Sequence, residues 1–484
     1  MRRDAGNPWM VSGRGRIPVV LGVLLLFLPG MFLPPGVAAA GGWRETAAMA
    51  DSRFYHTATL LGDGRVLVTG GQRDTEEYPD CLDGCEIYDP SKEAWLPAEK
   101  LPGVRSLHTA TLLRDGRVLA AGGQDLFGEI RSCCIYDPAA GTWTAAAADL
   151  RDYRMGHTAT LLGDGRVLVT GGIVNVGSIK TSAEIFDPPS GTWSPAGDMK
   201  WPRGWHTATL LPDGRVLVFG GWSGRGPLNT AEIFDPLSET WSEASFLEGR
   251  PLFWHTATLL PAHGGMVLVA GENMSGGDGK AVHVYGVAAN AWFRDFSAMI
   301  EKRSEHTATL LPDGTVLLAG GHSMAGYAKS ERFDPSTLKF VDAGPMAVRS
   351  SGHTATLLPG GSVLVAGGKN RSGSGPLSRA EIYSLEDPFP FLEGIEPARA
   401  AAGTPGVRIT LSGSGFTPRS RVLWNGRERV TAFSGPGELG AVIPAEDLAR
   451  PGEAAVTVFT PPPGGGTSGE SFFSVMGHRR REAP

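Results

Sequence analysis

The sequence lacks several features that would indicate a nucleic-acid-binding, membrane-spanning or metal-centred protein. Its 44 Lys and Arg against 50 Asp and Glu give a net charge of −6, so no basic surface for nucleic acid is predicted. After residue 40 no apolar run approaches the roughly 20 residues that a membrane span requires. Only four cysteines occur; no histidine outside a repeated motif lies near them, so no metal site is predicted.

Signatures of common catalytic sites are equally scarce. No paired carboxylates recur at a suggestive spacing. No glycine-rich loop opens a helix, so a phosphate cradle is not predicted. A Gly-x-Ser-x-Gly nucleophile elbow needs a strand-to-helix turn, and the pattern of this chain is all-β. The 68 glycines and 36 prolines are typical of such a turn-rich protein.

What the chain does have is one motif copied seven times. The letters HTATLL recur at intervals of 47 to 52 residues, beginning at His56, His108, His157, His206, His255, His306 and His353. A period near 50 indicates one supersecondary unit copied around a ring or along an array. Residues that recur in every copy predict scaffold, so function is expected where the copies differ.

Each copy predicts four short strands. HTATLL is the first, and an Asp-Gly turn leads to the second, Arg65 to Gly71 in the first copy. The third reads EIYDP or EIFDP, and the fourth begins at a tryptophan. No such fourth strand follows Tyr383, whereas Trp43 stands alone before the first copy. We therefore expect residues 42–49 to complete the seventh unit and close the ring.

The double glycine, the late tryptophan and an arginine three residues before most of the histidines resemble the kelch repeat of β-propellers, over roughly residues 42–386. The resemblance implies an all-β, seven-bladed kelch-type propeller over 41–386, closed by an N-terminal strand. Because side chains alternate across a strand, each repeated histidine is expected to face a neighbouring blade. A buried, hydrogen-bonded structural role is predicted for it, not a metal ring.

The flanks predict export and a second domain. Residues 1–40 read as a signal peptide cut after Ala40, with an uncleaved membrane anchor as the alternative. The protein is expected to be secreted or on the cell surface, the periplasm included, with no stable membrane insertion after cleavage. A linker over 387–393 precedes short alternating strands over 394–476, a small immunoglobulin-like β-sandwich that resembles the IPT/TIG domain. Residues 477–484 read as a solvated basic tail.

Four cysteines fit an oxidising compartment, and three pairings of them are conceivable. The preferred prediction is a Cys81–Cys85 bridge and a strained vicinal Cys133–Cys134 bridge. Free thiols are the alternative.

A propeller followed by an immunoglobulin-like domain also resembles the galactose oxidase architecture, whose copper is held by two tyrosines and two histidines. Tyr55-His56-Thr57 is a local likeness to it. However, His56 is one of seven equivalent histidines, and His478 is the only histidine of the C-terminal region. The prediction is therefore a non-enzymatic protein without a cofactor.

Aromatic and polar residues gather in the variable loops of the fourth and fifth repeats. The candidate ligand-binding residues are Trp205, Trp222, Trp254, Arg225, Glu272 and Asn273. Aromatic rings beside polar groups suit a glycan or a protein ligand, although the rings could instead fill gaps between blades. Two other functions stay open. One is an extracellular carbohydrate-active enzyme, either a copper oxidase or a hydrolase or lyase that uses loop carboxylates. The other is a structural element of a surface assembly.

Overall fold

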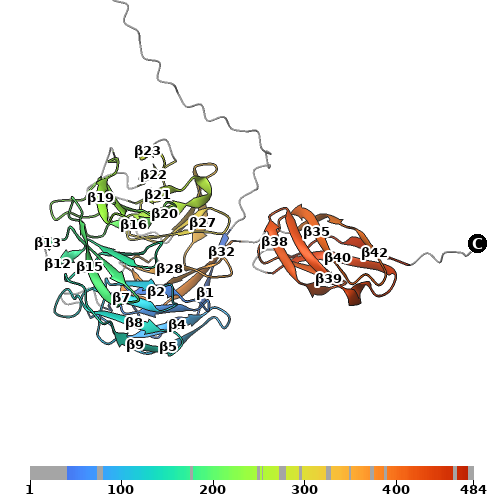
Figure 1. Cartoon of the computed structure of the whole chain (residues 1–484), viewed down its shortest axis with the longest axis horizontal. Coiled ribbons are helices and arrows are strands. Elements are labelled where there is room, and N and C mark those ends of the chain that lie inside the picture. The colour runs from blue at the N-terminus through green and yellow to red at the C-terminus, as the bar shows by residue number, and fades with distance from the viewer. Residues whose placement is uncertain are drawn as a thin grey trace, which may run out of the picture. The chain divides into compact units, whose positions relative to one another are not determined.

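The structure is a computed structural model, and it is almost entirely β (Figure 1). It describes residues 41–73, 80–174, 178–247, 251–252, 254–271, 280–293, 297–322, 329–347, 350–370, 375–385, 390–461 and 466–477. The predicted signal peptide therefore lies outside the described residues, as does the predicted tail apart from Gly477. None of the helices in these ranges has the length and apolar character needed to cross a membrane.

Seven four-stranded antiparallel sheets, the blades, form the first domain within the described ranges. Blades one to three are β2 (Thr57–Leu60), β3 (Val66–Thr69), β4 (Cys85–Asp89) and β5 (Ala94–Ala98); β6 (Thr109–Leu112), β7 (Val118–Ala121), β8 (Cys133–Asp137) and β9 (Thr142–Ala145); and β10 (Thr158–Leu161), β11 (Val167–Thr170), β14 (Ser182–Asp187) and β15 (Thr192–Asp198). A small hairpin of β12 (Ile173–Val174) and β13 (Ser178–Ile179) extends the third blade.

The remaining blades repeat the pattern. They are β16 (Thr207–Leu210), β17 (Val216–Phe219), β18 (Ala231–Asp235) and β19 (Thr240–Glu243); β20 (Thr256–Leu260), β21 (Met266–Ala270), β22 (Val282–Gly286) and β23 (Ala291–Phe293); β24 (Thr307–Leu310), β25 (Val316–Ala319), β26 (Lys329–Asp334) and β27 (Lys339–Pro345); and β28 (Thr354–Leu357), β29 (Val363–Ala366), β32 (Ala380–Leu385) and β1 (Gly41–Thr46). The seventh carries the hairpin β30 (Lys369–Asn370) and β31 (Gly375–Pro376).

The N-terminal strand closes the ring, as the sequence predicted. β1 pairs antiparallel with β32, and Trp43 lies opposite Tyr383. The two rings are 5.2 Å apart between centroids, and Trp43 Nε1 donates a hydrogen bond of 2.7 Å to Ser330 Oγ in the sixth blade. The innermost strands of successive blades touch all the way round, and β28 touches β2. The described part of the propeller is thus a closed seven-membered ring of sheets.

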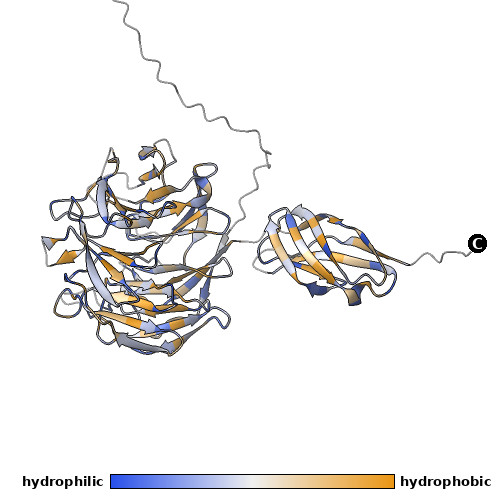
Figure 2. Ribbon diagram, viewed as in Figure 1, coloured by the Kyte–Doolittle hydropathy of each residue, from blue (hydrophilic) through white to orange (hydrophobic). Residues whose placement is uncertain are grey.

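The core lies between the blades. All four residues of β3 are buried, because each blade packs against a neighbour on both of its faces. Such strands read as continuous apolar runs, which is how the second strand of each repeat reads. The tyrosine of the third strand packs on the tryptophan of the fourth, as in Tyr88–Trp95 with centroids 5.1 Å apart. Figure 2 shows the apolar residues concentrated on the strands of the blades.

A buried ion pair ties the strand entry to the third strand in four blades. The pairs are Arg53–Glu86 at 2.8 Å, and Arg154–Glu184, Arg203–Glu232 and Arg303–Glu331, each at 2.6 Å. The same arginines donate to the carbonyl of the first glycine of the double glycine. In the second blade Arg105 keeps this carbonyl bond, but Cys134 stands where the other four blades have glutamate.

The predicted disulfides are not present. All four cysteines are buried free thiols. Cys133 and Cys134 are consecutive residues of β8, so their side chains point to opposite faces. Cys134 packs in the core between blades one and two, and Cys133 in the core between blades two and three. A vicinal bridge would require the strand to be broken. Cys81 Sγ is within 3.4 Å of Ser106 Oγ, and Cys85 Sγ donates to the Asp83 carbonyl instead.

The C-terminal domain is a β-sandwich of two sheets. One contains β33 (Phe391–Glu396), β35 (Gly406–Ser414), β39 (Glu438–Pro444) and β38 (Thr431–Gly435); the other contains β34 (Arg399–Ala401), β42 (Ser471–Met476), β40 (Gly452–Thr460), β36 (Arg421–Trp424) and β37 (Arg427–Arg429), with β41 (Gly466–Thr467) beside β40. Trp424 and Phe473 pack in its core. β33 begins at Phe391, inside the segment predicted as a linker, because its pairing with β35 extends to that residue.

Candidate functional site

The repeated histidines form a belt around the inside of the ring. Each donates to, or accepts from, the threonine that follows the histidine of the preceding blade. The pairs are His56–Thr354, His108–Thr57, His157–Thr109, His206–Thr158, His255–Thr207, His306–Thr256 and His353–Thr307, at 3.0 to 3.2 Å. The predicted scaffold role is confirmed, and function must lie elsewhere.

A second ring consists of the seven residues that directly precede these histidines, here called the axial ring. They are Tyr55, Leu107, Gly156, Trp205, Trp254, Glu305 and Gly352. Backbone hydrogen bonds of 2.9 to 3.3 Å link successive members, from Tyr55 N to Gly352 O, Leu107 N to Tyr55 O, Gly156 N to Leu107 O, Trp205 N to Gly156 O, Glu305 N to Trp254 O and Gly352 N to Glu305 O. The ring brings seven side-chain positions, far apart in sequence, around one axis.

Every member of the axial ring has a left-handed backbone, with φ between 51° and 64°. Glycine adopts this conformation freely, but a side chain there costs about 1–2 kcal/mol. Bulky residues at positive φ are genuine outliers. Trp205 and Trp254 are two such outliers, in neighbouring blades. Tyr55, Leu107 and Glu305 carry side chains in the same conformation, so the hydrogen bonds between successive members impose it whatever residue is present.

The two indoles lie side by side. Trp205 and Trp254 have centroids 5.4 Å apart with the rings tilted by 57°, and both residues are half-buried. A Cβ added to Gly156 would lie 2.8 Å from the Trp205 indole nitrogen. The glycine of the third blade therefore makes room for the ring of the fourth. These residues create an apolar sector on one side of the axis.

Polar groups form the adjoining part of the axial ring. Lys369 Nζ donates a 2.6 Å hydrogen bond to the Tyr55 hydroxyl and lies 3.4 Å from Glu305 Oε2. The side chains of Glu305 and Lys369 are only 5% and 13% exposed. Oε2 of Glu305 is buried and accepts no hydrogen bond from the described residues. The Lys369 ammonium balances the charge of this carboxylate, but Oε2 still has a lone pair to which a ligand hydroxyl can donate.

The structure distributes the predicted site residues unevenly. It brings Trp205 and Trp254 together on the axial ring. The backbone of Trp222 bridges to Gly204, which directly precedes Trp205, and to Pro227. Arg225 is exposed on the turn of the same loop. Glu272 and Asn273 lie outside the described residues.

Tyr55, Glu305 and Lys369 were not among the predicted site residues. A signal for the first two existed, since the residue before each repeated histidine varies while the histidine does not. Lys369 had no such signal, because only the closed ring brings it to Tyr55, 314 residues away.

The copper centre of the galactose oxidase architecture does not fit these residues. Tyr55 lies on the axial ring, but His56 is buried between blades and is held by Thr354. The Tyr55 hydroxyl accepts from a lysine ammonium. In the described part of the chain no three His, Cys, Asp or Glu side chains lie close enough to hold a metal ion. Among the described residues, Tyr55 and His56 are therefore not arranged as a pair of copper ligands.

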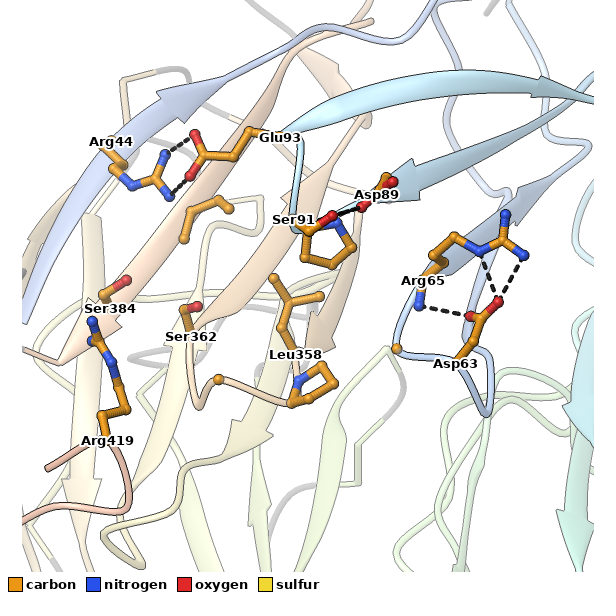
Figure 3. Close-up of a pocket in the computed structure, with 15 residues that line it drawn as sticks. Arg44, Asp63, Arg65, Asp89, Ser91, Glu93, Leu358, Ser362, Ser384 and Arg419 are labelled. Carbon is orange, nitrogen blue, oxygen red and sulfur yellow. Dashed lines mark hydrogen bonds and ion pairs between the residues drawn. The ribbon is translucent and has the colours of Figure 1, made fainter. Parts of the chain in front are cut away.

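The face of the propeller opposite the axial ring carries turns with ion pairs (Figure 3). Arg65 donates to Asp63 within the Asp-Gly turn at 2.8 Å, and this hydrogen bond lowers the pKa of Asp63. Arg44 of β1 faces Glu93, with a contact of 2.8 Å. Exposed pairs of this kind contribute about 0–1 kcal/mol. The Asp63–Arg65 pair recurs in other Asp-Gly turns, as Asp115–Arg117, Asp164–Arg166 and Asp213–Arg215, which indicates that it belongs to the turn structure.

Comparison with known proteins agrees with this architecture. The kelch motif model matches residues 154–200 and 206–245, and the IPT/TIG domain model matches residues 390–475. Galactose oxidase of Gibberella zeae is 27% identical over 122 residues, which is 23% of this chain and 17% of that protein. Human Kelch-like protein 33 is 31% identical over 114 residues, 23% of this chain and 21% of that protein. The chain thus spans about a fifth of the length of these relatives.

A solved structure has the same fold over most of the chain. It is a fungal alcohol oxidase of the AA5 family in complex with copper, with a TM-score of 0.61 and 16% identity, covering 90% of this chain and 100% of that one. Fold and repeats together define a β-propeller followed by a β-sandwich. The chain is a kelch-repeat propeller protein with a C-terminal IPT/TIG domain.

Proposed function

We propose that this protein is a secreted or surface-exposed binding protein whose axial ring holds a glycan. One observation carries the proposal: Trp205 and Trp254 adopt a left-handed backbone that Gly156 and Gly352 adopt in other blades without strain. The ring of blades therefore does not need a tryptophan at this position. A strain of about 1–2 kcal/mol at each tryptophan is offset if the indoles serve a ligand.

The chemistry of the axial ring suits a sugar. The apolar face of a pyranose stacks on a tryptophan ring, and its hydroxyls need donors and acceptors at the edge. The indole pair supplies the first. Tyr55, Lys369 and the buried carboxylate of Glu305 supply the second, from the adjoining part of the ring, where Glu305 directly follows Trp254. A ligand hydroxyl would donate to Glu305 Oε2, which the described residues leave without a hydrogen bond.

A glycan array with the purified protein tests this. The double variant Trp205→Ala/Trp254→Ala should lose specific binding, whereas Phe472→Ala, which removes a 57% exposed ring in the sandwich domain, should not. Melting curves of all three proteins must agree. Binding retained by the double variant would mean that the indoles only pack. If the unaltered protein binds no glycan, the glycan proposal fails. The axial ring would then bind a protein partner, or the protein would have a structural role.

The likeness to galactose oxidase favours an extracellular carbohydrate-active enzyme as the second candidate. Its copper form conflicts with the donor set described above, and no step is derived through that metal. A hydrolase or lyase would need convergent carboxylates, and the loop that carries Glu272 lies outside the described residues. Product analysis after prolonged incubation of the protein with each glycan that it binds would reveal such an activity.

A further inference from the structure

Two exposed aromatic rings on the loops entering blades three and four each carry a stacked cation. Tyr153 is 50% exposed, and the guanidinium of Arg131 lies 5.6 Å from its ring centroid. Trp201 is 39% exposed, and the ammonium of Lys200 lies 5.7 Å from its centroid. Each pair presents a flat apolar surface together with a positive charge. We call Arg131, Tyr153, Lys200 and Trp201 the cationic rim.

The loops of the cationic rim are firmly anchored. Leu150 and Met199, a few residues before the two rings, are 0% and 2% exposed. Their amides donate to the carbonyls of Arg131 and Thr181, at 3.1 and 2.9 Å. The backbone that carries the two aromatic residues is therefore held in place on neighbouring blades. A pre-organised surface loses little entropy when it binds a ligand.

The cationic rim has fewer free carboxylates than the equivalent loops of other blades. Blades one, three and six have an acid two residues before the buried arginine: Asp51, Asp152 and Glu301. In the fourth blade Trp201 takes that position, so a carboxylate is lost where an exposed ring is gained. In the third blade Asp152 is occupied internally, by Ser182 Oγ at 2.6 Å and Lys180 Nζ at 3.0 Å. Exposed Arg151 adds a further cation beside it.

We propose that the cationic rim binds an acidic polysaccharide, a chain of uronate-type sugars. A sugar ring stacks on the part of Tyr153 or Trp201 that the cation leaves exposed, and the carboxylate of the sugar pairs with that cation. Two such pairs in successive blades suit a ligand that repeats both chemical groups. This proposal rests on the proposed function, in which the ligand is a glycan. It adds that the glycan is negatively charged and that it has a second contact area away from the axial ring.

One competing group is already present. Lys200 pairs with Glu243, and both side chains are 58% exposed. Ion pairs this exposed are weak in water, so a sugar carboxylate can replace that of Glu243. The interaction with the ligand should weaken with salt, because both partners are solvated charges.

Calorimetric titration of the purified protein with an oligogalacturonate tests the proposal, beside a neutral oligosaccharide of equal length. The uronate should bind more tightly than the neutral chain, and more weakly at high salt. Tyr153→Ala/Trp201→Ala and Arg131→Gln/Lys200→Gln should each weaken uronate binding by about tenfold or more, one lost contact of ~1.4 kcal/mol being tenfold. Phe472→Ala and Lys339→Gln, both at exposed residues elsewhere, serve as matched controls.

The outcomes separate the two proposals. Uronate affinity unchanged in both rim variants, but abolished in Trp205→Ala/Trp254→Ala, would overturn the rim and leave the axial site standing. The rim proposal would also be overturned if only Arg131→Gln/Lys200→Gln weakened uronate binding. Non-specific attraction between opposite charges does not require an aromatic ring. If the unaltered protein binds neither oligosaccharide nor any glycan on the array, both proposals fail.

Discussion

The Nε2 atom of His56 lies 3.0 Å from the Oγ1 atom of Thr354, although 298 residues separate them. This contact joins the first blade to the seventh in the way that every other repeated histidine joins its blade to the one before. The belt of histidines and threonines therefore has no gap. Its imidazoles are only 5–6% exposed, so the ring is closed on the inside by buried polar bonds and on the outside by β1.

Acid should destabilise the propeller through this belt. Burial, with nearby arginines, lowers the pKa of all seven histidines, to about 3 for His157 and His255 and about 4 for His353. The unfolded chain has histidine pKa values near 6.5. Because the folded values are lower, unfolding takes up protons below about pH 6.5. Stability is complete above that pH and falls as the pH drops toward 4.

Urea unfolding at a series of pH values measures the effect. One histidine contributes a slope of about 1.4 kcal/mol per pH unit between its two pKa values. His206→Gln, which removes one titrating group, should reduce the slope by about that amount. A stability that is flat between pH 7 and about pH 5 would contradict a buried neutral belt.

Trp43→Ala should destabilise the propeller more than its terminal position suggests. The change removes the contact with Tyr383 and the hydrogen bond to Ser330 of the sixth blade. A loss of roughly 3 kcal/mol is expected, in the range for large-to-small tryptophan substitutions. Thermal melting checks it, with Phe391→Ala in the sandwich domain as a control. An unchanged melting temperature would count against closure by β1.

The buried arginines should respond unequally to removal. Arg203→Met leaves Glu232 buried without its cation and should cost about 3–5 kcal/mol. Arg105→Met should cost much less, because the second blade has Cys134, and not a glutamate, at the position opposite this arginine. Conversely, Cys134→Glu should stabilise the protein by supplying the counter-charge to Arg105. Chemical denaturation of the three variants provides the comparison, and equal losses for the two methionine variants would refute the role given to the ion pair.

Gly156→Ala should disturb the indole pair. The added methyl would lie 2.8 Å from the Trp205 ring and force the indole to move. Glycan binding should fall together with stability. Gly116→Ala is the matched control: its φ is also positive, at 86°, but nothing lies within 4 Å of the added Cβ. Both variants carry the backbone cost of about 1–2 kcal/mol, so only the first should lose more than that, and only the first should lose binding.

Thiol titration should find four free cysteines. In the folded protein they should react slowly, because burial raises the pKa of Cys85 and of Cys133 to about 12 and only the thiolate attacks. After unfolding in denaturant without reductant, all four should react at once. A count of fewer than four free thiols would instead support the disulfide bridges that the sequence predicted.

The sequence by itself determined the architecture. The period of HTATLL, the Asp-Gly turns and the late tryptophans are local and repeated, so each copy specifies its strands and the copies specify a ring. Even the closure was predictable. Trp43 precedes the first copy, and the seventh copy lacks a fourth strand of its own. Local chemistry also determined that the histidines are scaffold, since a residue present in seven copies cannot mark one site.

Only the tertiary structure decided where a ligand site could form. The residues before the histidines become neighbours through ring closure, which brings Tyr55 to Lys369 and Trp205 to Trp254. Their left-handed backbone follows from hydrogen bonds between blades, and no local pattern encodes it. The cysteines show the same limit: adjacency in sequence favoured a Cys133–Cys134 bridge, whereas alternation along β8 sends the two thiols into different cores. Local periodicity is written in the chain, but contacts across a closed ring depend on all seven blades at once.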